Sequence, residues 1–376
     1  MNTILFISSS LSYGGAEKML CLLANELAAR HNRIIVLNLM EHRENAGRLN
    51  ENVDVINIEP IKIKYLDRID QLLRIIKNVK KIKPDIVISF KFRPNYLAVI
   101  AGKVLNCPVI ISERCDPSKE YELRGRVKLY WRIINQADGG VFQLKGALQY
   151  YSEGMQNRGI VIPNPIEKSD TKTHVVRKNE NSRIIVSVGR LVNQQKRYDI
   201  MLKAFQIFHN HNPNYILKIY GDGEDEDYIR EWIKNFGLEN EVFIEGKTSD
   251  PIGAMDGADV FLTTSDYEGI SNSLLEAMSI GMPIVATDCT PGGARMLIED
   301  GKNGLLVPCG NVDLIAAALG KMAENYTLRR DCGKRAKDVT KIYSKDRIMN
   351  MWIHYITIVI KRHSRRKKYN NKRDKD

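Results

Sequence analysis

Glu268 and Glu276, two carboxylates with seven residues between them, form the first pattern in this chain that could do chemistry. The apolar, β-branched run at 258–265 ahead of them ends in hydroxyl residues, which predicts a buried strand. Residues 274–278 follow a helical pattern, so we expect Glu268 on the intervening loop and Glu276 about two turns into the helix. Backbone N–H groups of residues 271–273 would lie at the positive helix end and could bind a diphosphate, with the carboxylates accepting hydrogen bonds from sugar hydroxyls. The ordinary alternative is a loop charge followed by a helix surface charge.

Two further loops carry groups suited to binding an anion. Gly14 and Gly15 follow the first predicted strand and precede a helix, so the backbone could approach a bulky anion closely there. Arg190 and Lys196 follow a later predicted strand, Ile184–Val188, and could converge on one phosphate group. The ordinary alternatives are a tight strand-to-helix turn and two solvated loop charges.

Strand and helix patterns alternate through both halves of the chain, which at 376 residues is too long for one ordinary core. The predicted strands are Ile4–Ser8, Ile34–Leu39, Val53–Ile58, Asp85–Phe90, Val109–Ser112, Gly139–Gln143, Ile160–Ile162, Ile184–Val188, Tyr215–Tyr220, Val242–Ile244, Val260–Thr264, Pro283–Thr287 and Gly304–Val307. This alternation predicts an α/β protein with two Rossmann-like parallel-sheet domains, whose strand carboxyl ends would face a shared cleft. The expected parts are an N-terminal domain at 1–163, a polar linker at 164–183, a C-terminal domain at 184–345, a helix at 346–360 and a basic tail at 361–376.

The positive charge of the chain is concentrated at its C-terminal end. The formal net charge is +12, and residues 361–376 supply +7 of it, with nine Lys and Arg against two Asp. A nucleic-acid enzyme would normally spread its basic residues over a folded face, so this distribution argues against a nucleic-acid partner. Six scattered cysteines show no metal-ligand spacing, and no run reaches the ~18 apolar residues of a membrane-spanning helix. We expect a cytoplasmic protein with reduced cysteines.

Two short motifs resemble sites with other chemistry, but the residues around them argue against both. Gly246-Lys247-Thr248 resembles the end of a Walker A loop, but Glu241 stands where that motif needs glycine. Asp225-Glu226-Asp227 resembles a metal-binding Asp-x-Asp pair, but it precedes a helix, where acidic residues favour the positive end. We therefore expect neither nucleotide hydrolysis nor a bound metal.

Taken together, these motifs in their order resemble glycosyltransferase family 4, whose members are retaining enzymes of the GT-B fold, over nearly the full length of the chain. The segments that carry the resemblance are Gly14–Glu17, Gly189–Arg190 with Lys196, Tyr220–Glu224, Glu245–Gly246, the Glu268–Glu276 pair and Asp300–Val307. Residues 111–117 further resemble bacterial members that extend lipid-linked surface glycans. The resemblance also implies that the helix at 346–360 packs back across the two domains.

The resemblance implies transfer of a hexose from a nucleotide sugar, with a UDP-sugar favoured, to a hydroxyl of a glycan acceptor, with the anomeric configuration retained. Arg190 and Lys196 would hold the donor diphosphate, and Glu268 would hold the donor sugar. Glu276 would bind the ribose hydroxyls. The remaining donor-binding candidates are Gly15, Gly221, Gly246 and the backbone amides near Ile270, Ser271 and Asn272. Because cationic side chains would stabilise the departing diphosphate, we expect no metal and no other cofactor.

On the acceptor side this chain departs from the family pattern. Many members carry a histidine in the loop after the strand at 109–112, where this chain reads Glu113-Arg114-Cys115. Either Arg114 or Glu113 could take over a polar contact to the donor sugar. These two residues and Gly14 are therefore the acceptor-side candidates.

Two other functions fit the same architecture. A sugar-nucleotide epimerase would turn over the donor without an acceptor, and a non-catalytic membrane-associated scaffold would not need Arg190, Lys196 and Glu268 together. The basic tail at 361–376 is expected to stay in water and to bind anionic lipid headgroups. We therefore expect peripheral binding at the inner face of the plasma membrane, in surface polysaccharide or glycoconjugate assembly. Nucleic-acid binding by the tail is the rival, and no stacking platform accompanies it.

Overall fold

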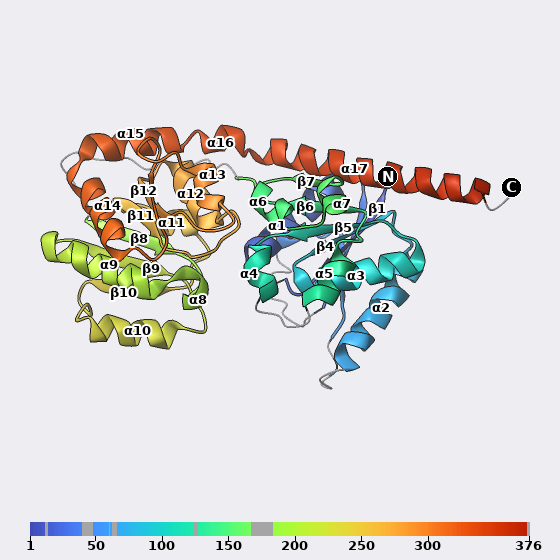
Figure 1. Cartoon of the computed structure of the whole chain (residues 1–376), viewed down its shortest axis with the longest axis horizontal. Helices are drawn as coiled ribbons and strands as arrows, with labels where there is room; N and C mark the ends of the chain where they lie inside the picture. The colour runs from blue at the N-terminus through green and yellow to red at the C-terminus, as the bar shows by residue number, and fades with distance from the viewer. Residues whose placement is uncertain are drawn as a thin grey trace. The chain divides into compact units, whose positions relative to one another are not determined.

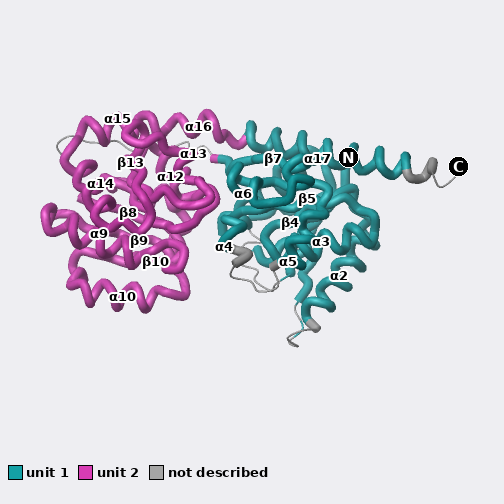
Figure 2. Tube along the Cα trace, viewed as in Figure 1, with its two compact units in different colours: residues 1–165, 346–376 teal, residues 166–345 magenta. Residues whose placement is uncertain are grey.

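A computed structural model of the chain describes residues 1–11, 14–39, 48–59, 61, 66–122, 127–166 and 183–373. It divides into two compact units, which we call unit 1 (Met1–Pro165 with Asp346–Asp376) and unit 2 (Ile166–Lys345) (Figure 2). Most of the linker expected at 164–183 lies outside the described residues. Each unit contains a parallel sheet with helices packed against it (Figure 1), which confirms the predicted α/β class.

Unit 1 is built on a seven-stranded parallel sheet in the order β3-β2-β1-β4-β5-β6-β7. Its strands are β1 (Thr3–Ser8), β2 (Arg33–Asn38), β3 (Val53–Asn57), β4 (Ile86–Phe90), β5 (Val109–Glu113), β6 (Gly139–Phe142) and β7 (Gly159–Val161). Strand β1 pairs with both β2 and β4, so the order of the strands reverses at this point of the sheet. In open α/β sheets, ligands bind at the carboxyl ends of the strands at such a switch point.

Helices cover both faces of the unit 1 sheet. They are α1 (Gly15–Ala29), α2 (Leu66–Ile82), α3 (Phe92–Leu105), α4 (Pro117–Glu122), α5 (Val127–Ile134), α6 (Lys145–Gln149), α7 (Glu153–Gln156) and α17 (Lys345–Arg373). On one face, α1 and α17 share a core with the sheet, in which Leu23 and Trp352 pack with Phe6. Helix α3 contacts α2, α5, β4 and β5 and covers the other face (Figure 1). The C-terminal helix is therefore part of the fold of unit 1.

Helix α17 is longer than the sequence suggested. A helix was expected at 346–360 with a basic tail after it, but α17 continues to Arg373 (Figure 1). Residues 361–369 are exposed apart from His363, whose Nε2 lies 3.1 Å from the backbone oxygen of Asn106. The basic segment is thus a helical extension of α17, and it contacts unit 1 through His363 near the start of the segment. Within the described ranges, no helix is long and apolar enough to cross a bilayer.

Unit 2 contains a six-stranded parallel sheet in the order β10-β9-β8-β11-β12-β13. Its strands are β8 (Ile184–Val188), β9 (Ile216–Tyr220), β10 (Val242–Gly246), β11 (Val260–Thr263), β12 (Ile284–Thr287) and β13 (Leu305–Val307). Every strand expected from the sequence is present in the two units, with ends shifted by a residue or two. This agreement follows from the short β-branched runs that buried parallel strands require.

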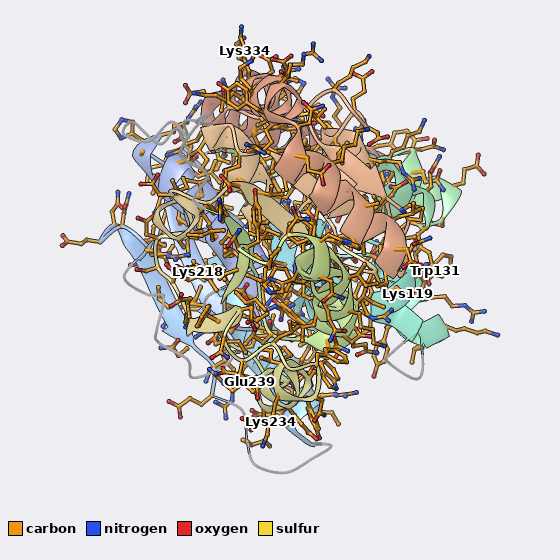
Figure 3. All side chains as sticks on the ribbon, turned by 90° about the vertical axis from the view of Figure 1, so that its left-hand side faces the viewer. Lys119, Trp131, Lys218, Lys234, Glu239 and Lys334 are labelled. Atoms are coloured by element: carbon orange, nitrogen blue, oxygen red, sulfur yellow. The ribbon has the colours of Figure 1, made fainter. Side chains whose placement is uncertain are left out.

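The helices of unit 2 are amphipathic and cover its sheet. They are α8 (Asn193–Lys196), α9 (Tyr198–His211), α10 (Glu226–Asn235), α11 (Pro251–Met255), α12 (Asn272–Ile280), α13 (Gly293–Leu297), α14 (Val312–Glu324), α15 (Tyr326–Ala336) and α16 (Val339–Ile342). Helices α9, α10 and α14 bury Phe205, Ile229 and Leu319 in one core with the sheet. Charged residues lie on the outer faces of the helices, and Lys234 of α10 and Lys334 of α15 project from the surface of unit 2 (Figure 3).

Candidate functional site

The loops that leave β8 and β11 meet at the carboxyl edge of the unit 2 sheet. These strands are neighbours, so their loops leave the sheet side by side. The Lys196 ammonium comes from the first loop and the Glu268 carboxylate from the second, and Nζ lies 2.9 Å from Oε2. The two side chains are only 12% and 19% exposed, so solvent screens this ion pair weakly.

Gln195, which was not among the residues selected from the sequence, joins the charged groups of this site. Its amide Nε2 donates to Glu268 Oε2 at 3.0 Å and to the backbone oxygen of Tyr267 at 3.1 Å. Its Oε1 accepts from Arg190 Nη2 at 3.3 Å. Lys196 therefore contacts Glu268 directly, whereas Arg190 reaches it through Gln195. No sequence pattern indicated this role of Gln195, because a glutamine pair before a lysine is typical of an ordinary polar loop.

Helix α12 begins just after Glu268. Ser271 is its N-cap, and the hydroxyl oxygen accepts from the backbone N–H of Leu274 at 3.4 Å. Glu276 lies in the second turn of the helix and is half-buried. The loop position of Glu268 and the helical position of Glu276 are as predicted. The positive end of the helix dipole consequently lies beside the loop that carries Glu268.

Two glycine contacts let the loops of unit 2 approach one another. A Cβ on Gly221 would overlap the backbone oxygen of Gly189, and the Gly221 N–H donates to the Gly246 oxygen at 2.8 Å. A Cβ on Gly293 would likewise overlap the backbone oxygen of Gly269. Any side chain at Gly221 or Gly293 would separate these loops. Gly293 was not selected from the sequence, because its partner lies on another loop.

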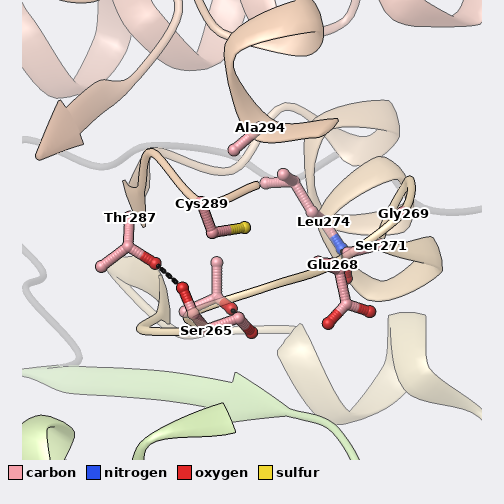
Figure 4. Close-up of a pocket in the computed structure, with 9 residues that line it drawn as sticks. Ser265, Glu268, Gly269, Ser271, Leu274, Thr287, Cys289 and Ala294 are labelled. Atoms are coloured by element: carbon pink, nitrogen blue, oxygen red, sulfur yellow. Dashed lines mark hydrogen bonds between the residues drawn. The ribbon is translucent and has the colours of Figure 1, made fainter. Parts of the chain in front are cut away.

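A small pocket lies beside Glu268 (Figure 4). It is lined by Thr263, Ser265, Glu268, Gly269, Ser271, Leu274, Thr287, Cys289 and Ala294. The Thr287 hydroxyl donates to the backbone oxygen of Ser265 at 2.6 Å and ties the ends of β11 and β12 together (Figure 4). Burial raises the pKa of the Cys289 thiol, and the charge of Glu268 raises it further. Cys289 therefore stays protonated and serves as an apolar wall of the pocket.

In unit 1, the predicted glycine loop leads directly into α1. Gly14 is the N-cap and Gly15 the first helical residue. Glu17 is buried at 2% exposure, accepts from the Ser10 hydroxyl at 3.1 Å and forms an ion pair with Lys91. A Cβ on Gly14 would overlap the Glu17 carboxylate, so a side chain there would displace this buried group. Glu17 thus joins the loops after β1 and β4, at the switch point of the sheet.

Glu113 and Arg114 are both engaged in the packing of unit 1. The buried Glu113 carboxylate accepts from the Tyr151 hydroxyl at 2.8 Å and from the Arg114 N–H at 3.0 Å. The Arg114 guanidinium lies 5.3 Å from the ring centroids of both Phe90 and Trp352. Burial lowers the pKa of Arg114 to about 9, partly opposed by Glu113, so Arg114 is still charged at neutral pH. Their acceptor-side roles stay predictions.

The acidic triplet at 225–227 has the structural role expected from its context. Asp225 is the N-cap position of α10, and Glu226 and Asp227 lie in its first turn. The Asp225 carboxylate also accepts from the Asn193 N–H at 2.6 Å and so holds the loop before Lys196. In the part of the chain that the structure describes, no group of three or more His, Cys, Asp and Glu is placed to hold a metal ion. Metal independence of the reaction stays a prediction.

Two models of known protein families match the sequence of this chain. The family model "Glycosyltransferase Family 4" matches residues 13–170, and "Glycosyl transferases group 1" matches residues 168–339. The two matches follow each other and span the main parts of both units. The chain belongs to glycosyltransferase family 4. As a member of this family it is a transferase, and the resemblance read from its motifs is confirmed.

Curated relatives of this family 4 chain include bacterial enzymes whose names state their acceptors. It is 27% identical over 367 residues to an alpha-1,4-N-acetyl-D-galactosaminyltransferase of Campylobacter jejuni named for an undecaprenol-linked glycan, covering 96% of this chain and 99% of that protein. It is 27% identical over 265 residues to the poly(glycerol-phosphate) alpha-glucosyltransferase of Bacillus subtilis. That match covers 70% of this chain but only 39% of the Bacillus protein, so the chain spans well under half of this relative.

Solved structures confirm the GT-B fold of the family 4 chain. Anabaena HepE in complex with UDP and glucose matches with a TM-score of 0.80 and 19% identity, over 95% of this chain and 100% of that one. Staphylococcus aureus TarM matches with a TM-score of 0.76 and 15% identity, over 95% of this chain and 99% of that one. At these identities the likeness shows the fold alone.

Proposed function

We propose that the chain transfers a hexose from a nucleotide sugar, with a UDP-sugar favoured, to a hydroxyl of a glycan acceptor with retention of the anomeric configuration. One observation carries this proposal. The Lys196–Glu268 pair lies at the start of α12, and Arg190 is attached to it through Gln195. Two cations, a carboxylate and a helix N-terminus in one loop cluster provide what a departing diphosphate and sugar hydroxyls need.

In this proposal the enzyme accelerates transfer by stabilising the negative charge of the leaving group. As the bond between the anomeric carbon and the diphosphate oxygen breaks, negative charge grows on the diphosphate. Lys196 and Arg190 stabilise that charge together with the α12 N-terminus, a role that a metal takes in other enzymes. The bond from Lys196 Nζ to Glu268 Oε2, at 2.9 Å, holds the ammonium at the edge of this loop cluster. Retention means that the acceptor hydroxyl bonds to the anomeric carbon on the face that the diphosphate leaves, and the proton of this hydroxyl passes to the departing diphosphate.

The remaining donor contacts are assigned by position. Glu268 accepts hydrogen bonds from hydroxyls of the donor sugar, and Glu276 accepts them from the ribose. The backbone at Ile270, Ser271 and Asn272 contributes to the phosphate cradle, and Gly15, Gly221 and Gly246 allow close approach of backbone to ligand. On the acceptor side, Gly14, Glu113 and Arg114 stay the candidates.

We further propose that the acceptor is lipid-linked and that the protein works at the inner face of the plasma membrane. The Campylobacter relative named for an undecaprenol-linked glycan, aligned over 99% of its length, supports this acceptor class. The exposed basic stretch 361–369 of α17 supports membrane contact. Anionic headgroups attract such residues by about 1 kcal/mol per basic side chain near the surface.

A donor screen tests the proposed function. Saturation-transfer NMR with a panel of UDP-, GDP- and ADP-sugars should give contacts for at least one nucleotide sugar, with UDP-sugars favoured. Lys196→Ala should weaken those contacts, whereas Lys203→Ala, an exposed position on α9, should leave them unchanged. Failure of every nucleotide sugar to bind the wild-type protein would contradict the proposal.

A further inference from the structure

Arg197, the residue after Lys196, has an unusual backbone conformation. Its φ of 54° and ψ of 53° lie in the left-handed region, which is unfavourable for a residue with a Cβ. A residue is retained in this region when the contacts around it determine the conformation. The Arg197 side chain has such contacts, because its Nε and Nη2 donate to the two carboxylate oxygens of Asp199 at 2.9 and 3.0 Å.

The third contact of Arg197 reaches the other loop of the site. Its Nη1 donates to the Asp266 carboxylate at 2.5 Å. Asp266 precedes Glu268 by two residues, and its N–H donates to the backbone oxygen of Gln195 at 2.9 Å. Arg197 and Asp266 thus join the segment that ends in Lys196 to the segment that ends in Glu268.

A bound donor would compete for the bond between Lys196 and Glu268. Lys196 would turn part of its ammonium to the diphosphate, and Glu268 would turn to the sugar. The loops would then be held by hydrogen bonds away from the donor, such as that from the Thr264 hydroxyl to the Lys196 backbone oxygen at 2.9 Å, and by the Arg197–Asp266 pair. Among the described residues, the hydrogen bonds of the Arg197 guanidinium go to Asp199 and Asp266 and not to the Glu268 carboxylate.

We infer that Arg197 is a positioning residue for the donor diphosphate. It acts through Asp266 to hold the loops that carry Lys196 and Glu268 in the positions that bind the donor. This inference rests on the proposed donor site. Arg197→Gly is the informative variant, because glycine adopts the left-handed conformation freely and removes only the guanidinium contacts. Arg183→Gly is the matched control. Arg183 also has a positive φ, of 55°, but it lies at the start of β8, and its N–H bond to Asp259 is retained in glycine.

The test is calorimetric titration of the full chain with UDP and with UMP, or with the matching pair of GDP or ADP nucleotides if the donor screen selects another base. UMP lacks the β-phosphate, so a merely structural defect should weaken both ligands alike. We expect Arg197→Gly to weaken UDP binding about tenfold and UMP binding less than about twofold. Asp266→Asn should give the same pattern, and Arg183→Gly should match the wild type.

A double-mutant cycle distinguishes failure of this inference from failure of the donor-site assignment. If Arg197 acts through the Lys196–Glu268 pair, Arg197→Gly should have little further effect on UDP binding in the Lys196→Ala background. An equal loss in both backgrounds, or wild-type UDP affinity of Arg197→Gly, would overturn the inference while leaving the donor site in place. Wild-type UDP affinity of Lys196→Ala would overturn the donor site and the inference with it.

Discussion

Lys196 and Glu268 are 72 positions apart in the sequence, yet the lysine Nζ lies 2.9 Å from the glutamate Oε2. Parallel pairing of β8 with β11 brings their two loops to one edge of the unit 2 sheet. The ion pair is thus a product of strand order, and it places a cation and an anion beside the N-terminus of α12.

The first prediction concerns the two cations. Lys196→Ala and Arg190→Ala should each slow transfer at least ~100-fold, a loss of roughly 2.7 kcal/mol of transition-state stabilisation, because each would neutralise the leaving diphosphate. Initial rates against donor concentration provide the measurement, with Lys203→Ala as the control. Glu276→Ala should instead mainly raise the KM for the donor, since ribose contacts persist from ground state to transition state. Near-native kinetics of the lysine and arginine variants would refute the site assignment.

The second prediction concerns metal. Transfer should persist in excess EDTA, because Lys196, Arg190 and the α12 N-terminus would supply the positive charge that a metal supplies elsewhere. Rates with and without chelator, and after adding back Mg²⁺ or Mn²⁺, measure this directly. Activity that disappears with EDTA and returns with either ion would show that the diphosphate binds elsewhere.

The third prediction concerns the attachment of α17 to unit 1. The Tyr355 hydroxyl donates to the backbone oxygen of Arg158 and accepts from the Gly140 N–H at 2.9 Å. Burial raises the pKa of Tyr355 to about 12 from its ordinary value near 10. Because the folded-state pKa is the higher one, the stabilisation is fully present below about pH 10 and is lost as the pH rises through about 12.

Tyr355→Phe should therefore lower the free energy of unfolding at pH 8 by about 1 to 2 kcal/mol. It should also lose less stability than the wild type between pH 9 and 11. Urea unfolding followed by circular dichroism across this range measures both effects, and Tyr228→Phe, on an exposed side chain of α10, is the control. A variant whose stability falls as steeply with pH as the wild type would disprove the role given to the phenol.

The fourth prediction concerns the basic extension of α17. Replacing the basic residues of 361–368 with glutamine should greatly reduce cosedimentation with anionic liposomes, since glutamine keeps helix propensity but removes the charge. Deletion of 361–376 should act in the same way, and high salt should weaken binding of the wild type by screening. Glutamine at Lys234 and Lys334, both exposed on unit 2, is the control. Undiminished binding of the neutralised chain would exclude the extension as the anchor.

Sequence patterns were sufficient for the strands and for part of the site. Buried parallel strands are local runs of apolar residues, and the strand–loop–helix order around Glu268 and Glu276 is equally local. Gln195 and Arg197 were not found in this way. Their partners, Glu268 and Asp266, lie about seventy residues further along the chain, and no local pattern signals a contact between loops of neighbouring strands.

The length of the C-terminal helix was not predicted, for a different reason. Residues 361–368 were read as a tail because a run of like charges usually stays in solvent. Lysine and arginine are nevertheless good helix formers, and extending an existing helix avoids the cost of a new nucleus. Since Trp352 and Tyr355 already fix the preceding segment on unit 1, the helix continues through the charged run.

The most direct test of the proposed transfer is NMR of the donor and product anomeric signals while the full chain turns over its nucleotide sugar, with and without a lipid-linked glycan acceptor. We expect the donor to be consumed when the acceptor is present and the new linkage to keep the anomeric configuration of the donor. A product of inverted configuration would contradict retention. Conversion of the donor into a second sugar nucleotide without acceptor would contradict transfer and indicate an epimerase.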